Sequence, residues 1–392
     1  MTDLQEFRAA TRAWLEENCP QEMRQPMNEA DVCWGGRNWV FQSDAQRDWL
    51  NAMADRGWTV PEWPKAYGGG GLNGDEQRVL KEELDRINAR PPLQSFGIWM
   101  LGPALLEFGT EEQKRHYLPQ VARGEIRWCQ GYSEPGAGSD LAGVQTKGVD
   151  IDDYFEVSGQ KIWTSYADKA DWIFCLVRTE PDAPKHKGIS FLLFDMASEG
   201  VTTKPIKLIS GASPFCETFF DGVKVPKDQI VSERGKGWTV AKYLLTHERE
   251  MIGSSDAALF GSEDLVEVAR DAIGLNENNQ LDDPVLRGKI ADFLIDELAF
   301  DAELARVKDW MRAGNQLGVE SATLKYTGTE LNKRRQELIM EAGGLEALEW
   351  DFANAESDEK ASLWLRSKGN SIEGGTSEVM LSILSKAVLE LG

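Results

Sequence analysis

The sequence predicts an α+β protein with more than one domain, because helical and strand patterns occupy separate stretches of the chain. Hydrophobic residues recur with helical spacing in residues 1–124 and 236–392, whereas short strand-like runs fill residues 125–235. The 392 residues also exceed what one hydrophobic core usually supports. We therefore expect an N-terminal helical domain at 1–124, a middle β domain at 125–235 and a C-terminal helical domain at 236–392.

The first part is expected to contain helices at 46–56, 75–90 and 111–123, which Gly and Pro residues separate. The glycine run at 68–71 is interpreted as a plain loop, because no lysine follows it as in a phosphate-binding loop. In the last part, hydrophobic residues at helical spacing are Leu286, Ile290, Phe293, Leu294, Leu298, Leu324, Leu331, Leu338 and Ile339.

The middle part is predicted to be a compact domain of short strands. Runs rich in β-branched and aromatic residues lie at 172–177, 189–194 and 217–225. Residues 154–157 and 160–163 flank the dipeptide Ser158-Gly159, a pattern that predicts a hairpin with a two-residue turn.

Composition excludes several classes of function. The formal net charge of −22 argues against a nucleic-acid ligand, because phosphate binding needs a basic surface. No hydrophobic run approaches the ~20 residues that span a bilayer, and the acidic N-terminus is unlike a cleavable signal. We expect no membrane span, no metal site and a cytoplasmic protein with reduced thiols at Cys19, Cys33, Cys129, Cys175 and Cys216.

The most informative segment is 130–140, which reads Gln-Gly-Tyr-Ser-Glu-Pro-Gly-Ala-Gly-Ser-Asp. Such flexible backbone exposes peptide N–H groups to a ring oxygen or a phosphate. Ser133 lacks the second glycine of a nucleophile elbow, and the segment lacks the third glycine of a dinucleotide fingerprint. Composition alone favours an ordinary surface turn, in which Glu134 and Asp140 are turn-forming carboxylates.

This segment resembles the signature of the acyl-CoA dehydrogenase family, flavoenzymes that desaturate acyl-CoA thioesters between the α and β carbons. Segments 61–69, 161–165 and 374–378 resemble, in the same order, the family's N-terminal loop, second flavin-contacting strand and C-terminal flavin loop. The resemblance implies two helical domains around a β-barrel, the last domain being a four-helix bundle. It also implies FAD as cofactor and an acyl-CoA substrate.

The chemistry of that family requires a carboxylate beside the α carbon, hydrogen bonds to the thioester carbonyl, and a hydride acceptor, which flavin N5 supplies. The resemblance places Trp163 against the flavin ring, and Ser139 at the pyrophosphate or at the CoA arm of the substrate. Without the resemblance, Trp163 would be interpreted as a buried strand aromatic. The implied cofactor-binding residues are Gln130, Tyr132, Ser133, Gly138, Ser139, Trp163, Thr164, Ser165, Thr376 and Glu378.

The expected catalytic base is Glu248. Many family members carry the base as the Glu of a Tyr-Glu-Gly-Thr segment, but Gly374 occupies that position here and Glu373 comes one place too early. A second branch carries it on an earlier helix directly before an Arg, which matches Glu248 and Arg249. Arg249 is then expected to fix the base loop or the substrate. Without the resemblance, Glu248 would belong to a solvated helix face. His247 is a competing base that would point about 100° away from Glu248 on a helix.

The segment 237–249 resembles the large subunits of bacterial pimeloyl-CoA and steroid side-chain acyl-CoA dehydrogenases, which pair with a smaller paralogous subunit. Residues 276–283 lack the Arg-x-x-Phe-Gly pattern that family homotetramers offer to a neighbouring flavin. The resemblance implies a homo-oligomer or a heteromer with that smaller subunit, and electron-transfer flavoprotein as the acceptor. A same-fold acyl-CoA oxidase, flavin monooxygenase or desulfinase, or a non-catalytic scaffolding subunit, stays open as an alternative.

Overall fold

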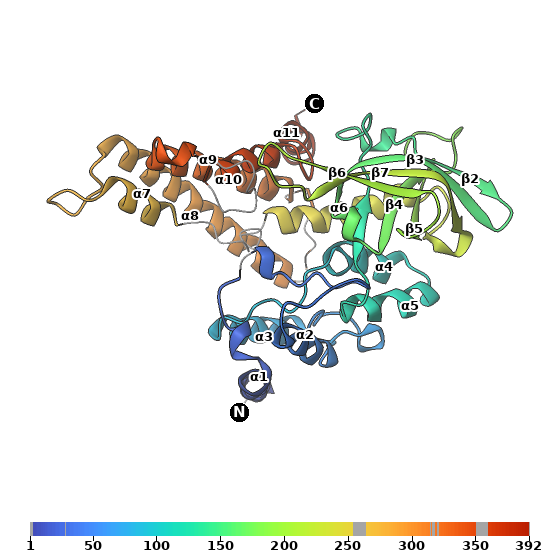
Figure 1. The fold of residues 1–392 in the computed structure, drawn as a ribbon, viewed down its shortest axis with the longest axis horizontal. Coiled ribbons are helices and arrows are strands. Elements are labelled where there is room, and N and C mark those ends of the chain that lie inside the picture. The colour runs from blue at the N-terminus through green and yellow to red at the C-terminus, as the bar shows by residue number, and fades with distance from the viewer. Residues whose placement is uncertain are drawn as a thin grey trace. The chain divides into compact units, whose positions relative to one another are not determined.

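The computed structural model describes residues 3–27, 29–253, 264–313, 315, 318–319, 321–349 and 360–391, with the backbone alone at 29, 246–253 and 312 (Figure 1). Two compact units are present. Unit 1 comprises Met1–Lys204 and Phe215–Leu244, and unit 2 comprises Pro205–Pro214 and Leu245–Gly392. The domain boundaries at 124/125 and 235/236 stay a prediction.

Unit 1 begins with helices whose ends are set by side-chain caps. Asn73 and Thr110 each form a capping box, with Glu76 and Gln113 respectively, which satisfies the first free N–H groups of two helices. The predicted helix at 75–90 ends earlier, because Asn88 adopts a left-handed φ of 50°. The helices are α1 (Asp3–Asn18), α2 (Asp44–Asp55), α3 (Gly74–Arg86), the π-helical turn η4 (Gly97–Leu101), α4 (Gly102–Phe108) and α5 (Glu111–Ala122).

A buried carboxylate joins α1 to α3. Glu83 receives hydrogen bonds from Arg12 at 2.9 Å, Arg86 at 2.8 Å and Arg8 at 3.1 Å. The hydrogen bonds from Arg12 lower the pKa of Glu83 to about 2, with further help from Arg86 and Arg8 and against the effect of desolvation. The two helices are therefore joined by charge as well as by hydrophobic packing.

The eight strands form one sheet in the order β6-β7-β3-β2-β4-β5-β8, with β1 paired in parallel to β4. Both halves of the sheet contribute to one hydrophobic core, so the sheet curls over itself. The strands are β1 (Trp128–Gly131), β2 (Lys147–Ile151), β3 (Tyr154–Ser165), β4 (Trp172–Arg178), β5 (Ile189–Asp195), β6 (Val201–Ile206), β7 (Phe215–Pro226) and β8 (Ile230–Val231).

The expected closed β-barrel is wrong, because this sheet is open. Its two outer strands, β6 and β8, do not pair with each other in the part of the chain that the structure describes. Pro205 removes one backbone donor from β6, and β8 has only two residues, so neither edge offers a full hydrogen-bonding ladder.

The expected hairpin around Ser158-Gly159 is also wrong. Residues 154–165 form the single strand β3, and both of its halves pair with β7. Ser158 and Gly159 instead lie where the register shifts, and the Ser158 hydroxyl accepts a hydrogen bond from the Gly222 N–H. The Ser-Gly dipeptide, which predicted a two-residue turn, instead forms a β-bulge.

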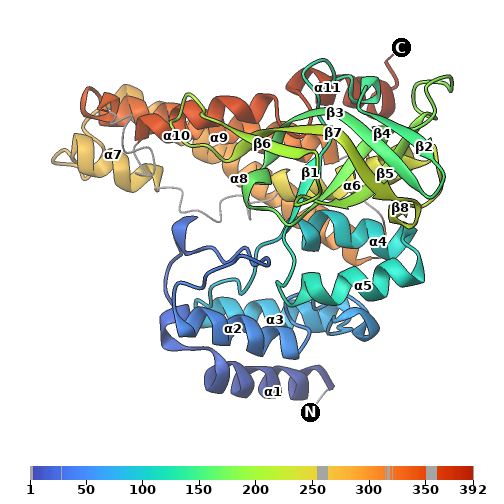
Figure 2. The ribbon, with the colours of Figure 1, turned by 45° about the vertical axis from the view of Figure 1, so that its right-hand side comes forward.

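The helices α4 and α5 pack on the sheet (Figure 2). The ring of Tyr117 contacts Trp128 and Trp172 at centroid distances of 5.2 and 5.3 Å. The Gln113 side chain donates to the backbone carbonyls of Asp228 and Ile230. Both aromatic packing and hydrogen bonds thus connect α5 to the strands of unit 1.

Unit 2 is helical, as predicted. Leu286, Ile290, Phe293 and Leu338 are buried in its core, whereas Leu298 is exposed. The helix α6 (Gly237–Gly253) passes from unit 1 into unit 2. The other helices are α7 (Leu265–Ile273), α8 (Pro284–Arg312), α9 (Ser321–Gly343), α10 (Lys360–Ser367) and α11 (Ser377–Ile383).

The described residues bear on three expectations from composition, which concern membrane-spanning helices, metal-binding clusters and thiols. No helix among the described residues combines the length and apolar character needed to cross a bilayer. The described residues also contain no cluster of three His, Cys, Asp or Glu side chains suited to a metal ion. All five cysteines are buried free thiols.

Candidate active site

The glycine-rich segment is a turn built around the carboxylate of Glu134. Glu134 and Ala137 exchange two backbone hydrogen bonds across the turn. The Glu134 carboxylate then accepts the backbone N–H groups of Gln145 at 2.6 Å and Thr146 at 2.8 Å. Glu134 therefore shapes the turn, as its interpretation as a turn-forming carboxylate expects.

A buried lysine fastens this turn to β3. Lys161 has a fully buried side chain and donates to the Glu134 carboxylate at 2.8 Å and to the Tyr132 carbonyl at 3.0 Å. Burial by itself raises the pKa of Glu134, but Lys161 and the backbone N–H donors outweigh it, so the pKa lies below its ordinary value. The backbone N–H of Ile162 also donates to the Ser133 carbonyl at 2.9 Å. Two segments that the sequence separates by about 30 residues therefore lie side by side.

Next to this junction, β3 adopts a conformation that exposes an indole ring. Trp163 has a φ of 60° and Tyr166 a φ of 51°, both unusual for residues other than glycine. The register against β7 shifts between Lys161 and Thr164. The Trp163 side chain is 52% exposed and meets the Phe215 ring edge-on at 6.0 Å. Trp163 is thus not a buried strand aromatic.

The hydroxyl groups near Trp163 differ in accessibility. Ser133 and Ser165 are half-buried, whereas Thr164 is fully buried, with a hydroxyl that has no hydrogen-bond partner among the described residues. The side chain of Tyr132 is buried and packs edge-on against Phe174, and its backbone carbonyl accepts the hydrogen bond from Lys161.

The remaining candidates of this segment lie in β1 and in the turn. Gln130 is half-buried on β1, opposite Phe174 of β4. Ser139 is exposed, and the space beside Gly138 is open. An exposed indole, two accessible hydroxyls and an open glycine turn match what a flavin ring and a pyrophosphate require. The residues present in unit 1 therefore fit a flavin.

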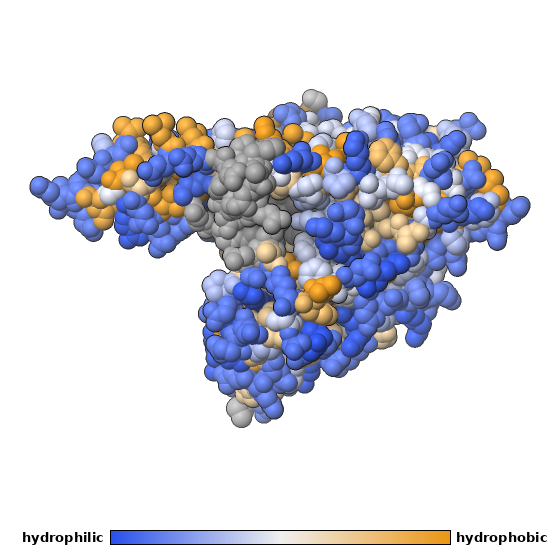
Figure 3. Space-filling view, viewed as in Figure 1, coloured by the Kyte–Doolittle hydropathy of each residue, from blue (hydrophilic) through white to orange (hydrophobic). Residues whose placement is uncertain are grey.

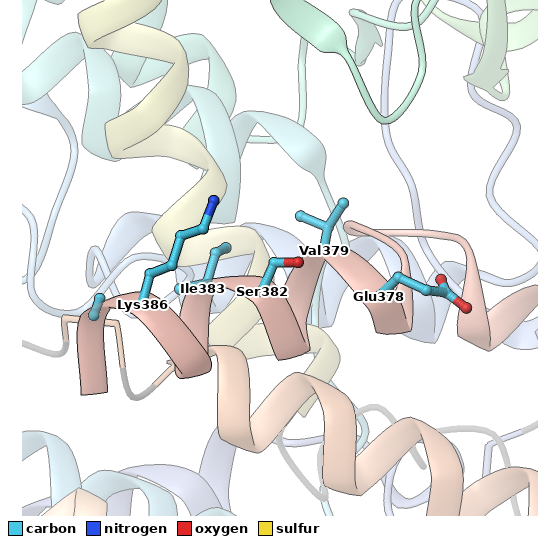
Figure 4. Close-up of a pocket in the computed structure, with 6 residues that line it drawn as sticks. Glu378, Val379, Ser382, Ile383 and Lys386 are labelled. Carbon is cyan, nitrogen blue, oxygen red and sulfur yellow. The ribbon is translucent and has the colours of Figure 1, made fainter. Parts of the chain in front are cut away.

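The C-terminal candidates lie in unit 2, at the start of α11. The Thr376 hydroxyl caps this helix by accepting the Val379 N–H at 3.2 Å. Hydrogen bonds from its own backbone N–H and from Thr376 lower the pKa of Glu378 below the usual value. Glu378, Ser382 and Lys386 line an open pocket of about 420 Å³ along one face of the helix (Figure 4).

A polar network on α9 holds the loop that precedes α11. The fully buried Lys325 donates to the Asn370 carbonyl at 2.9 Å, and Asn332 donates to the side-chain oxygen of Asn370 at 2.8 Å. Glu330 accepts the Ser377 hydroxyl at 3.0 Å. Neither Lys325 nor Lys161 is predicted from the sequence as a buried, structure-holding residue, because the sequence alone does not separate a buried lysine from a solvated one.

The structure describes the side chain of Glu373 but not that of the expected base, Glu248, or of His247. Glu248, Arg249 and His247 lie on α6, but their side chains are outside the described residues. Gly374 has a left-handed φ of 64°. Its neighbour Glu373 forms an ion pair with Arg366 at 2.8 Å and accepts a hydrogen bond from Asn370. Glu373 is thus engaged by a cation on the preceding helix.

Comparisons with known proteins agree along the whole chain. The N-terminal, middle and C-terminal domain models of acyl-CoA dehydrogenase match residues 1–125, 129–223 and 235–389. Acyl-CoA dehydrogenase IpdE1 of Mycobacterium tuberculosis is 33% identical over 393 aligned residues, which cover 100% of this chain and 98% of that protein.

Two solved structures are similar over nearly their full length. The Tcur3481-Tcur3483 steroid ACAD has a TM-score of 0.76 and 28% identity, with 100% of this chain and 98% of that chain covered. The ChsE4-ChsE5 complex from Mycobacterium tuberculosis has a TM-score of 0.73 at the same identity and coverage. The chain therefore belongs to the acyl-CoA dehydrogenase family, whose members are FAD-dependent flavoproteins.

Proposed function

We propose that this acyl-CoA dehydrogenase removes the α proton of an acyl-CoA thioester with Glu248 as the base. Bound FAD would supply, at N5, the acceptor for the hydride that leaves the β carbon. The observation that carries the proposal is the junction at Lys161, which fixes the Ser133 backbone beside β3 and leaves the Trp163 ring exposed. Preorganised polar groups of this kind position reactants without reorganisation during the reaction.

The residues of unit 1 have separate roles in holding the cofactor. The hydroxyls of Ser133 and Ser165 and the backbone of Gln130 and Tyr132 hydrogen-bond the flavin ring, and Trp163 packs on it. Gly138 and Ser139 contact the pyrophosphate, and Ser139 also serves the CoA arm. Thr164 contributes its backbone, because its hydroxyl is buried. The resemblance to the family adds Thr376 and Glu378 to the residues proposed to contact FAD.

Glu248 is preferred over Glu373 as the base. A base must reach the α proton with a free carboxylate lone pair, whereas the Glu373 carboxylate already accepts hydrogen bonds from Arg366 and Asn370. Gly374 leaves the usual C-terminal base position without any carboxylate. Arg249 fixes the base segment or the substrate thioester.

The proposed substrate is the CoA thioester of a steroid-derived acid. Support comes from the similar structure described as a steroid ACAD, which this chain matches over its whole length at 28% identity. Gly374 also leaves space where other family members carry a glutamate, which favours a large acyl group.

We further propose a heteromer with a smaller paralogous subunit. The loop at 276–283 closes on itself, since the Asn276 side chain accepts the N–H groups of Asn278 and Gln280. Two similar structures are two-component complexes by their titles. Hydrophobic side chains gather on the α7–α9 part of unit 2 (Figure 3). In the segment that follows α9, Leu345 and Leu348 are 84% and 63% exposed. An exposed hydrophobic surface of this kind is typical of a subunit interface.

The proposed electron acceptor is electron-transfer flavoprotein, and the proposed location is the cytoplasm. The five buried, unpaired thiols are compatible with a reducing compartment.

The test is a visible absorption spectrum of the purified chain, followed by anaerobic addition of acyl-CoA thioesters. We expect a bound flavin whose absorption bleaches with the substrate. Rapid reoxidation of that flavin by oxygen would identify an oxidase instead of a dehydrogenase. Flavin that binds but never bleaches with any thioester would contradict the proposed reaction.

A further inference from the structure

Unit 1 carries a continuous row of four aromatic side chains, Trp34, Phe96, Trp99 and Tyr166, called here the aromatic strip. Ring centroids of consecutive members are 5.4 Å apart for Trp99 and Phe96, 5.7 Å for Phe96 and Trp34, and 5.0 Å for Trp34 and Tyr166. The strip joins three separate segments: the loop before α2, the η4 turn, and the end of β3.

The strip differs from the aromatic core of the same unit. Trp49, Trp63 and Trp128 are at most 2% exposed, as expected for rings that fill a core. All four members of the strip are only half-buried. A row of rings that touch one another and keep part of their surface exposed offers a preformed hydrophobic face.

A buried cation supports the strip from one side. The Arg127 guanidinium carbon lies 4.9 Å from the Trp34 ring centre and 5.2 Å from that of Tyr166, and Arg127 is only 4% exposed. Arg127 therefore contacts both rings from within the protein. Its backbone is fixed in turn by two hydrogen bonds with Asp171. Cation–π contacts of this type hold rings in place.

Tyr166, at one end of the strip, directly follows Ser165 in the sequence. This end of the strip is therefore attached to the segment assigned to the flavin. Consecutive Cα atoms are only ~3.8 Å apart. We propose that the aromatic strip is a specificity-determining surface that recognises the fused rings of the acyl group. This inference rests on the proposed function and adds the residues that select the substrate. Flat rings stack on such a face over a large area, whereas a straight acyl chain gains little from it.

The test compares two probes on the flavin-loaded enzyme, together with its partner subunit if one co-purifies. One probe is the CoA thioester of a steroid carboxylic acid, and the other is butyryl-CoA. The variant Phe96→Leu/Trp99→Leu keeps hydrophobic side chains and removes two rings. We expect kcat/KM for the steroid thioester to fall ~10-fold, mainly through KM, and that for butyryl-CoA to stay within about twofold.

Matched variants separate the outcomes. Trp14→Leu removes a half-buried ring that contacts Trp49 and Trp58. This variant should leave kcat/KM unchanged for both thioesters. Trp99→Phe keeps a ring at this position and should retain most of the wild-type kcat/KM for the steroid thioester. Equal loss for both thioesters, no loss for either, or a wild-type enzyme that accepts only butyryl-CoA overturns the role of the strip. If neither thioester bleaches the wild-type flavin, the proposed function itself fails and the strip loses its basis.

Discussion

The buried pair of Lys161 and Glu134 links the stability of the fold to the candidate cofactor site. The sequence does not predict that these two side chains form an ion pair. Lys161 belongs to a segment that resembles a family motif, and Glu134 is interpreted only as a turn residue. The pair joins the turn to β3, so the backbone at Ser133 and the exposed ring of Trp163 depend on one ion pair. Removing one partner leaves the other charge buried, which is costly.

We predict that Lys161→Met lowers the free energy of unfolding by about 3–5 kcal/mol and weakens FAD binding. Chemical denaturation and FAD titration measure the two effects. The double variant Lys161→Met/Glu134→Gln should regain part of the stability, because no unpaired charge is left. Lys185→Met removes an exposed pair with Asp140 and should cost less than about 1 kcal/mol. Equal effects of Lys161→Met and Lys185→Met would contradict the prediction.

For the base, we predict that Glu248→Gln slows anaerobic bleaching of the flavin by substrate at least ~100-fold, since general-base catalysis contributes about 10²–10⁴. The visible spectrum of the bound flavin should not change. Stopped-flow absorbance is the measurement, and Glu250→Gln, two residues along α6, is the control. Normal bleaching by Glu248→Gln, together with loss of bleaching in Glu373→Gln, would move the base to Glu373.

Among the secondary-structure elements, the helices were the most predictable. The helices α2 and α5 begin within two residues of their expected starts, because caps such as Ser43 and Thr110 are visible in the sequence. The sheet was less predictable, since pairing partners are distant in sequence. A Ser-Gly dipeptide fits both a tight turn and a bulge, and only pairing of both halves of β3 with β7 decides between them.

The junction between α1 and α3 gives a pH-dependent prediction. The pKa of Glu83 is lowered from an ordinary 4.5 to about 2, so its contribution to stability is present above pH 4.5 and is lost as the pH falls toward 2. Glu83→Gln should be less stable than the wild type at neutral pH, and the difference should shrink between pH 4.5 and 2. Thermal unfolding against pH measures this. Glu82→Gln, an exposed neighbour, should show little of this dependence, and a pH-independent difference for Glu83→Gln would refute the assignment.

At the level of the molecule, the α+β class follows from the separate helical and strand patterns, and the family follows from four motifs in order. The subunit arrangement depends on surfaces that neither describes. We predict that co-expression with the smaller paralogue raises FAD occupancy and yields a stable complex with this chain. Native mass spectrometry and the ratio of flavin to protein absorbance measure both. A homo-oligomer of this chain with full flavin occupancy would exclude the heteromer.

The glycine pair that includes the usual base position, Gly374, also constrains how this enzyme could be redesigned. Gly374 and Gly375 both have left-handed backbones, with φ values of 64° and 102°. A glutamate introduced at Gly374 would have to adopt a conformation that costs ~1 kcal/mol, next to a Glu373 already committed to Arg366. Moving the proposed base from the α6 helix to this loop would therefore require several coordinated substitutions. A gradual exchange between the two branches of the family would pass through inactive intermediates, unless both bases coexisted for a time.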